Sequence, residues 1–180
     1  EQNIATQNQQ ALLNEQSLSV EICGLQDGDS RAVFKNTNLD IRVYERLRMF
    51  VHAESLVGEL EIQDGDLTAF IRIGRDFKSN YYEYEIPLNI TPAGVSDQDN
   101  DLIWPDRNEF NIELDSLVLV KQIRNLNTAN TTTPYTITDF RGNKISIVGN
   151  PDIGKVRTVM LGIRNPKATG ENNDDGLSKC

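Results

Sequence analysis

Apolar and polar residues alternate along several stretches of this chain, and that alternation restricts the possible folds more than any other feature. The clearest stretches are residues 18–23, 46–53, 67–74 and 81–88. Alternation with a period of two gives a strand one buried face and one solvent-facing face, which is typical of antiparallel sheets. Shorter candidates, separated by spacers with Gly, Asn, Asp or Pro, are residues 110–114, 135–138, 144–148 and 156–164. The pattern therefore predicts a chain built mainly of short strands.

One segment departs from this pattern and predicts a helix. Residues 115–126 carry Leu117 and Val120 at helical spacing, and Asp115 or Ser116 can cap the first turn. Because no long helices alternate with the strands, a parallel sheet is not expected. We predict an all-β fold, namely an antiparallel β-sandwich of jelly-roll type with one short helix.

The two ends of the chain differ in composition from the part between them. Residues 1–17 are rich in Gln and Asn and predict a polar linker. Residues 167–180 predict a polar tail that stops before a further strand. Residues 18–166 form the predicted sandwich domain. Because the chain begins with Glu1 and not with Met, we expect it to be a piece of a longer protein.

One hairpin can be aligned residue by residue. A turn at residues 76–79 pairs Ile73 with Tyr82, Ile71 with Tyr84, Arg72 with Glu83, and Phe70 with Glu85. A shift by one residue would move the apolar side chains to the wrong face. We therefore expect Ile71 and Tyr84 to be buried, and Glu83 and Glu85 to lie on a solvated face beside Arg72.

The charge of the chain excludes some partners. The 180 residues include 27 acidic and 18 basic side chains, which gives a formal net charge of −9. Such a surface repels phosphate backbones, so no nucleic-acid partner is expected. No apolar run approaches the length of about 18 residues that a membrane-spanning helix requires, so this fragment is not expected to span a membrane.

Candidates for catalytic or metal-binding sites are few. The single histidine, His52, excludes any site built from two imidazoles. Residues 27–29 and 64–66 both read Asp-Gly-Asp and resemble parts of calcium loops, but they lack the distal Glu and suit turns better. Glu83 and Glu85 share a strand face, yet an arginine partner makes Glu83 unsuited as a general acid. We predict no catalytic, cofactor-binding or metal-binding residue, and no enzyme activity.

Four aromatic residues are candidates for contact with a partner: Trp104, Tyr81, Phe50 and Phe70. If two or three of them lie exposed on one concave face, their rings can stack on sugar rings, and the chain would be a carbohydrate-binding module. Trp104 follows an acidic loop, and it could instead pin that loop to the sandwich. The fold class alone does not decide between these roles.

Four long runs, in order along the chain, resemble the SprA/Sov family. They are GLQDGDSRAVFKNTNLDIRVYERLRMFVHAE (24–54), GDLTAFIRIGRDFKSNYYEYEIPL (65–88), IWPDRNEFNIEL (103–114) and VGNPDIGKVRTVMLGIRNP (148–166). Proteins of that family are giant outer-membrane translocons of the type IX secretion system in Bacteroidetes, also linked to gliding motility. The resemblance implies that this chain is a non-catalytic structural or interaction domain of such a translocon.

The resemblance also implies a location and a set of partners. The domain would lie in the cell envelope, associated with the outer membrane on its periplasmic or extracellular side. Its partners would be other parts of the translocon barrel, secretion-system subunits and exported proteins. The resemblance supplies no catalytic residue and no cofactor. A carbohydrate-binding β-sandwich module of an envelope protein stays the alternative.

The implied location bears on the two cysteines, Cys23 and Cys180. The cell envelope is oxidising, which permits a disulfide. Cys23 lies in the first predicted strand and Cys180 follows the last, and the first and last strands of such sandwiches commonly lie close together. We therefore expect a disulfide between them, with a buried thiol at Cys23 as the alternative.

Overall fold

The structure is a computed structural model that describes residues 17–55, 62–96 and 98–166. The strands within these ranges are β1 (Ser30–Leu39), β2 (Arg46–Phe50), β3 (Thr68–Gly74), β4 (Tyr81–Pro87), β5 (Glu109–Glu113), β6 (Tyr135–Thr138), β7 (Lys144–Val148) and β8 (Val156–Arg164). The helical elements are α1 (Asn100–Ile103), the 3-10 turn η1 (Asp106–Asn108) and α2 (Leu114–Asn127). The helix predicted over residues 115–126 is therefore confirmed as α2.

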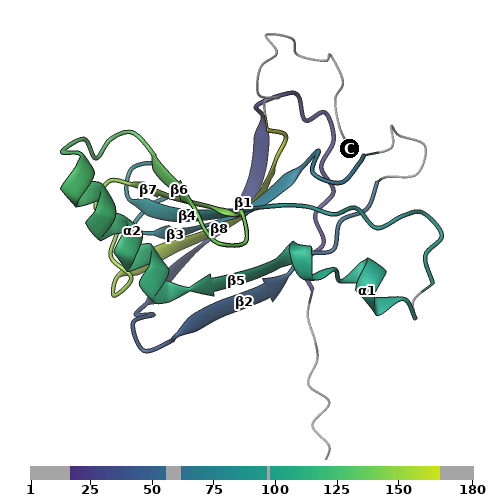
Figure 1. The fold of residues 1–180 in the computed structure, drawn as a ribbon, viewed down its shortest axis with the longest axis horizontal. Helices are drawn as coiled ribbons and strands as arrows, with labels where there is room; N and C mark the ends of the chain where they lie inside the picture. Colours follow the sequence, from purple (N-terminus) through teal and green to yellow (C-terminus); the bar gives the residue numbers. More distant parts are fainter. Residues whose placement is uncertain (1–16, 56–61, 97, 167–180) are drawn as a thin grey trace, which may run out of the picture.

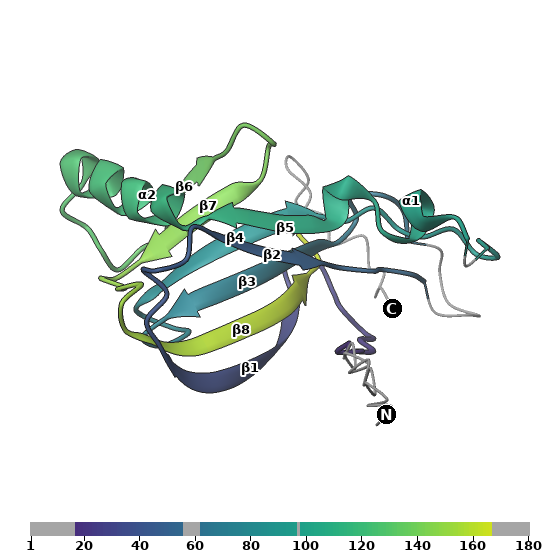
Figure 2. The same cartoon turned by 90° about the horizontal axis from the view of Figure 1, so that it is seen from below.

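The strands form two antiparallel sheets. Six of them join in the order β1-β8-β3-β4-β7-β6, and β2 pairs with β5 in a separate two-stranded sheet. Figure 1 shows α2 at one end of the molecule and α1 at the other. Figure 2 shows β2 and β5 passing across the larger, curved sheet. The all-β class and the antiparallel pairing predicted from alternation are confirmed.

The hydrophobic core lies between these two layers. Ile71 and Tyr82 of the larger sheet, Phe110 of β5 and Leu117 of α2 belong to one buried cluster, and each is at most 3% exposed. The Phe110 ring meets the Tyr84 ring edge to face, with 6.2 Å between their centroids. Burial of apolar faces from both sheets in one interior is what makes a sandwich stable.

The β3–β4 hairpin has the predicted register. Ile73 lies opposite Tyr82, and Arg72 lies opposite Glu83, as the alignment of the two apolar faces requires. The backbone N–H of Arg75 donates to the carbonyl of Asn80 at 2.9 Å, which closes the turn where it was expected. The pattern of alternation was therefore sufficient to fix this hairpin.

Asp76 holds the β3–β4 turn together. Its carboxylate accepts hydrogen bonds from the backbone N–H groups of Lys78 at 2.9 Å, Ser79 at 2.5 Å and Asn80 at 3.1 Å, and from the Asn80 side chain at 2.9 Å. Burial by itself would raise the pKa of this carboxyl, but the hydrogen bonds outweigh it and lower the pKa to about 2. The ionised form is therefore the one that stabilises the turn.

The low pKa of Asp76 predicts a pH-dependent contribution to stability. Because the folded-state pKa lies below 3.8, the ordinary value for an aspartic acid, the contribution is complete above about pH 4 and disappears as the pH falls to about 2. We expect Asp76→Asn to lower the free energy of unfolding by about 1 kcal/mol at pH 6. Urea melts of both proteins at pH 6 and near pH 2 measure this. Asp101→Asn, at an exposed residue of α1, is the control. A difference between wild type and Asp76→Asn that persists unchanged near pH 2 would contradict the assignment.

Two stretches near the start of the described chain differ from the sequence-based expectation. Residues 18–23 do not form a strand, although Ile22 packs against the core and the nearby Leu25 is 1% exposed. Strand β1 was not expected, because Ala32, Val33 and Phe34 follow one another without alternation. This strand lies at the edge of the sheet and is exposed along almost all of its length, so neither of its faces imposes the alternating pattern.

Candidate functional site

The face of the six-stranded sheet that points away from β2 and β5 carries a network of charged side chains. We call it the charged face, and its residues are Arg72, Glu83, Glu85, Lys144 and Arg164. Glu83 binds Arg72 and also Arg164, whose Nη2 lies 3.1 Å from Oε1. Glu85 binds Arg164 and also Lys144, whose Nζ lies 3.3 Å from Oε1. One guanidinium therefore bridges the two carboxylates.

The carboxylates of the charged face are buried, so the expectation that they are solvated was wrong. Glu83 is 6% exposed and Glu85 is 5% exposed. The alternation that predicted a wet face is present, but this face is covered by its own long side chains. Because a buried carboxylate is costly unless it is paired, the arginine partners offset the cost of burying these two side chains.

Aromatic rings form the other part of the charged face. The guanidinium carbons of Arg72 and Arg164 lie 5.3 Å and 4.7 Å from the centre of the Phe70 ring, and Arg72 lies 4.3 Å from the centre of the Tyr81 ring. Any side chain at Gly162 would collide with the Phe70 ring and with Ala32, so glycine there makes room for the ring. These cation–π contacts stack arginines over rings and shield both from water.

The four aromatic residues proposed as partner contacts fall into two groups. Phe70 and Tyr81 are 2% and 7% exposed in the charged face, so their rings are not available for stacking on a ligand. Phe50 and Trp104 are 43% and 45% exposed and meet at 76°, with 6.4 Å between ring centres. Such an edge-to-face pair does not present the broad flat platform on which sugar rings stack.

Trp104 also contacts His52, the single histidine. Their ring centres lie 5.6 Å apart, and His52 Nδ1 lies 3.1 Å from the carbonyl oxygen of Ile103, the residue before Trp104. These contacts connect the segment after β2 with the end of α1. Trp104 therefore contacts the end of β2 and the residues just after it. That it pins the loop before it stays a prediction.

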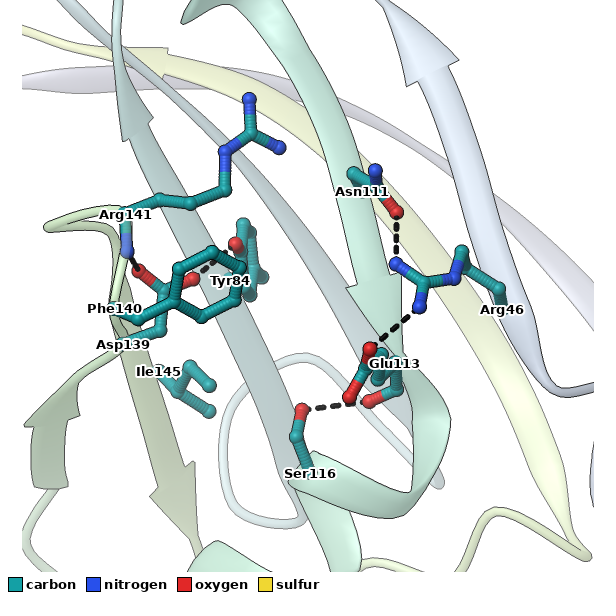
Figure 3. A pocket seen from close by; sticks show the side chains of 9 residues that line it. All are labelled: Arg46, Tyr84, Asn111, Glu113, Ser116, Asp139, Phe140, Arg141 and Ile145. Atoms are coloured by element: carbon teal, nitrogen blue, oxygen red, sulfur yellow. Dashed lines mark hydrogen bonds and ion pairs between the residues drawn. The ribbon is translucent and has the colours of Figure 1, made fainter.

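A small cavity lies between β4, β5 and the β6–β7 turn (Figure 3). Its volume is about 100 Å³, well below the roughly 300–1,000 Å³ of pockets that enclose small-molecule ligands. On one side Arg46 donates to Asn111 at 2.7 Å and to Glu113 at 2.5 Å. On the other side the Tyr84 hydroxyl donates to Asp139.

The Tyr84–Asp139 contact holds the β6–β7 turn against β4. The Tyr84 hydroxyl also accepts a hydrogen bond from Asn143 at 2.9 Å, and Asp139 accepts from the backbone N–H groups of Arg141 at 2.9 Å and Asn143 at 2.8 Å. Burial, with the hydrogen bond to Asp139 as a second cause, raises the pKa of Tyr84 to about 12. The phenol therefore stays protonated and serves as a fixed donor.

The same turn presents Phe140 to solvent. Phe140 is 95% exposed at the rim of the cavity, beside Arg141 (Figure 3). Arg107 donates to the carbonyl of Arg141 at 2.7 Å, and Arg141 donates in return to the carbonyl of Asp106 at 2.7 Å. The turn is thus held from both sides while the phenyl ring contacts water. The sequence analysis did not single out Phe140, although an apolar residue within the turn sequence Asp-Phe-Arg-Gly-Asn is the signal for it.

The Asp-Gly-Asp segments lie in turns, as expected. Gly28 and Gly65 both have positive φ angles, of 82° and 85°, that glycine adopts readily. Asp64 accepts a hydrogen bond from the backbone N–H of Ile90 at 2.7 Å, so this carboxylate joins two loops. Within the described ranges, no group of three or more His, Cys, Asp or Glu side chains is arranged to hold a metal ion.

The predicted disulfide involves a residue outside the described part of the chain. Cys23 is exposed, which does not fit the alternative of a buried thiol. Cys180 lies beyond residue 166, where the described part ends. The pairing of the two cysteines therefore stays a prediction.

Comparison with known proteins identifies a family. The family model SprA_N, described as a motility related/secretion protein, matches residues 1–177. No curated protein matches the chain. Among the described residues, none of the helices has both the length and the apolar character needed to cross a membrane.

Proposed function

Because this chain belongs to the SprA_N family of motility-related and secretion proteins, we propose that it is a non-catalytic structural and interaction domain of a type IX secretion translocon. In this role it supports protein export across the outer membrane and gliding motility in a member of the Bacteroidetes. It acts in the cell envelope, associated with the outer membrane. Its partners are other parts of the translocon, secretion-system subunits and exported proteins.

The observation that best supports an interaction role is the exposed Phe140 on a held turn. Aromatic and arginine side chains dominate the binding energy of protein interfaces, and Phe140 lies beside Arg141 and near Arg107. A rigid anchor loses little conformational freedom on binding. The hydrogen bonds of Asp139 and the two arginines supply that rigidity before any partner arrives.

The nearby cavity supports the same proposal. It is too small to enclose a typical substrate, and its phenol is held in the protonated form by burial and by Asp139. On one wall Arg46 binds Asn111 and Glu113, and on the other wall Tyr84 binds Asp139. The Tyr84–Asp139 contact positions the turn that carries Phe140.

Substitution of Phe140 tests the interaction role. In the full-length protein of a bacterium that uses type IX secretion, we expect Phe140→Asp to reduce export of cargo by about tenfold or more, because losing an aromatic anchor costs about 2 kcal/mol or more of binding. Immunoblots of cargo in the culture medium and the spreading of cells on agar measure export and gliding.

A second exposed apolar residue provides the matched control. Leu126 is 87% exposed at the end of α2, and Leu126→Asp changes size and charge in a similar way. We expect this variant to export cargo at the wild-type level. Wild-type export by Phe140→Asp, at an equal amount of protein in the envelope, would show that this turn is not the anchor.

A further inference from the structure

Strand β1 is an edge strand of the larger sheet, and residues 20–23 lie near residues 31–33 of this strand. It has ten residues, more than any other strand in the described part of the chain, and β8 is its one neighbour there. Within residues 17–55, 62–96 and 98–166, no backbone group of β1 bonds to a strand other than β8. An exposed edge leaves a row of N–H and C=O groups ready to pair with another extended chain.

The two faces of β1 carry different side chains. Arg31, Val33 and Lys35 lie on the core side of the sheet, because Val33 is opposite Leu161, which packs against the core. The other side carries Ala32 and Phe34. Val33 and Phe34 are 40% and 54% exposed, so each face offers one apolar contact.

A hollow next to Val33 leaves room for a further side chain. Its volume is about 270 Å³, and its lining combines the apolar Val20, Ile22, Ala32 and Val33 with Glu21, Cys23 and Arg31. On the opposite side of the strand, Phe34 rests on Phe77, with 4.9 Å between the ring centres. An added strand would thus find apolar surface on both faces.

Prolines, β-bulges and charged residues usually prevent an edge strand from pairing with other chains, and β1 has few of them. Residues 30–36 pair regularly with β8 and contain no proline, and the one irregularity comes later, between Asn36 and Leu39. Lys35 could by itself discourage pairing. However, Arg31 and Lys35 flank the exposed Val33 on one face, which repels basic strands and attracts acidic ones.

The charges also select among possible occupants. Two copies of this chain that joined through antiparallel β1 strands centred on Val33 would place Arg31 of one copy against Lys35 of the other. Like charges directly opposite destabilise a sheet. The ion pair of Arg31 with Asp29 is long, at 3.8 Å, and exposed, so it leaves the guanidinium accessible to another carboxylate.

We propose that β1 binds an extended acidic segment of a partner protein, which adds as an antiparallel strand to the edge of the larger sheet. On one face, the segment carries an apolar residue opposite Val33. An acidic residue on each side of it lies opposite Arg31 and Lys35. Its other face is apolar and lies beside Phe34. Main-chain hydrogen bonds supply affinity, and alternate side chains supply specificity. This inference deepens the proposed interaction role and rests on it.

Binding of a synthetic strand tests the proposal. We use the labelled peptide TEVVVET with the 180-residue chain, and the peptide TKVVVKT for comparison. Fluorescence anisotropy is expected to show saturable binding of the acidic peptide and at least tenfold weaker binding of the basic one. Amide hydrogen exchange is expected to slow at residues 30–36 when the acidic peptide is bound, because new main-chain hydrogen bonds form there.

A matched pair of variants locates the site. Lys35→Glu should weaken binding of TEVVVET about three- to tenfold, since one attractive contact becomes repulsive. Arg75→Glu makes the same charge change at an exposed residue next to β3, and it should leave binding unchanged. Both variants keep the backbone intact, so circular dichroism melts should match wild type.

Several outcomes would overturn the inference. These are no binding of the acidic peptide, equal binding of both peptides, or slowed exchange confined to another part of the chain. Concentration-dependent dimers that protect residues 30–36 would assign the edge to a second copy of this chain instead. None of these results depends on export, so the role of the Phe140 turn would stand or fall separately.

Discussion

Glu83→Ala should lower the free energy of unfolding by about 3–5 kcal/mol. Glu83 is 6% exposed and is bound by both Arg72 and Arg164. Removing the carboxylate leaves the partly desolvated guanidinium of Arg72 without its counter-charge, while Arg164 keeps only Glu85. That situation is far more costly than the loss of an exposed ion pair. Urea denaturation at pH 7, followed by circular dichroism, measures the change.

An exposed ion pair serves as the control for Glu83. Glu113 binds Arg46 at 2.5 Å, but its side chain is 56% exposed. Glu113→Ala should therefore cost at most about 1 kcal/mol, because water replaces the lost partner. If both substitutions cost the same small amount, the charged face is not buried as described, and its carboxylates contribute no more than surface charges.

Phe110→Ala is the second substitution with a large expected effect. Phe110 is 1% exposed and lies between the two sheets, where its ring meets that of Tyr84. Truncation removes apolar burial and leaves a cavity where two layers join, which typically costs about 3–5 kcal/mol for phenylalanine. We expect the same loss in urea melts and a lower melting temperature.

The control for Phe110 is a phenylalanine that contacts solvent. Phe140 is 95% exposed, so Phe140→Ala should change the free energy of unfolding by at most about 0.5 kcal/mol. The two phenylalanines thus separate folding from docking: Phe110 is required for the core, and Phe140 is proposed for the partner. A loss for Phe110→Ala as small as that for Phe140→Ala would mean that the two-stranded sheet does not pack on the larger one.

The sequence was informative where one face of a strand is buried. The β3–β4 hairpin could be aligned because Ile71 and Ile73 must face the interior, and one register satisfies that condition. Helix α2 could be recognised because its apolar residues recur at helical spacing and Leu117 is buried. A helix or strand with one buried face needs apolar residues at regular spacing, and that spacing can be recognised in the sequence.

Alternation in the sequence was misleading for strands of which both faces are buried, and it was absent from a strand of which neither face is buried. Glu83 and Glu85 read as solvated positions, because alternation does not reveal that long arginine side chains cover them. Strand β1 carries no pattern, since both of its faces are exposed. The burial of Glu83 and Glu85 and the pairing of β1 both depend on residues far away in the chain, such as Arg164. Local periodicity carries no information about such contacts.

The candidate site was predicted less well than the fold. The sequence grouped Phe70 and Tyr81 with Phe50 and Trp104 as possible contacts, but the structure buries the first two under arginines. Phe140 was missed because an isolated apolar residue in a turn usually has no function. Its significance appears only when the hydrogen bonds around Asp139 show that the turn is held in place.

The position of β8 within the larger sheet has a consequence for the order in which the chain can fold. Among the described residues this strand is the last in sequence, yet it lies between β1, the first described strand, and β3. A growing or threading chain therefore carries β1 without its neighbour until residues 156–164 are available. Pairings between such distant segments make folding slow, because a long loop must close before any contact compensates for the lost entropy. The larger sheet can therefore be completed only in a late step of folding, after β8 is available to pair with both β1 and β3.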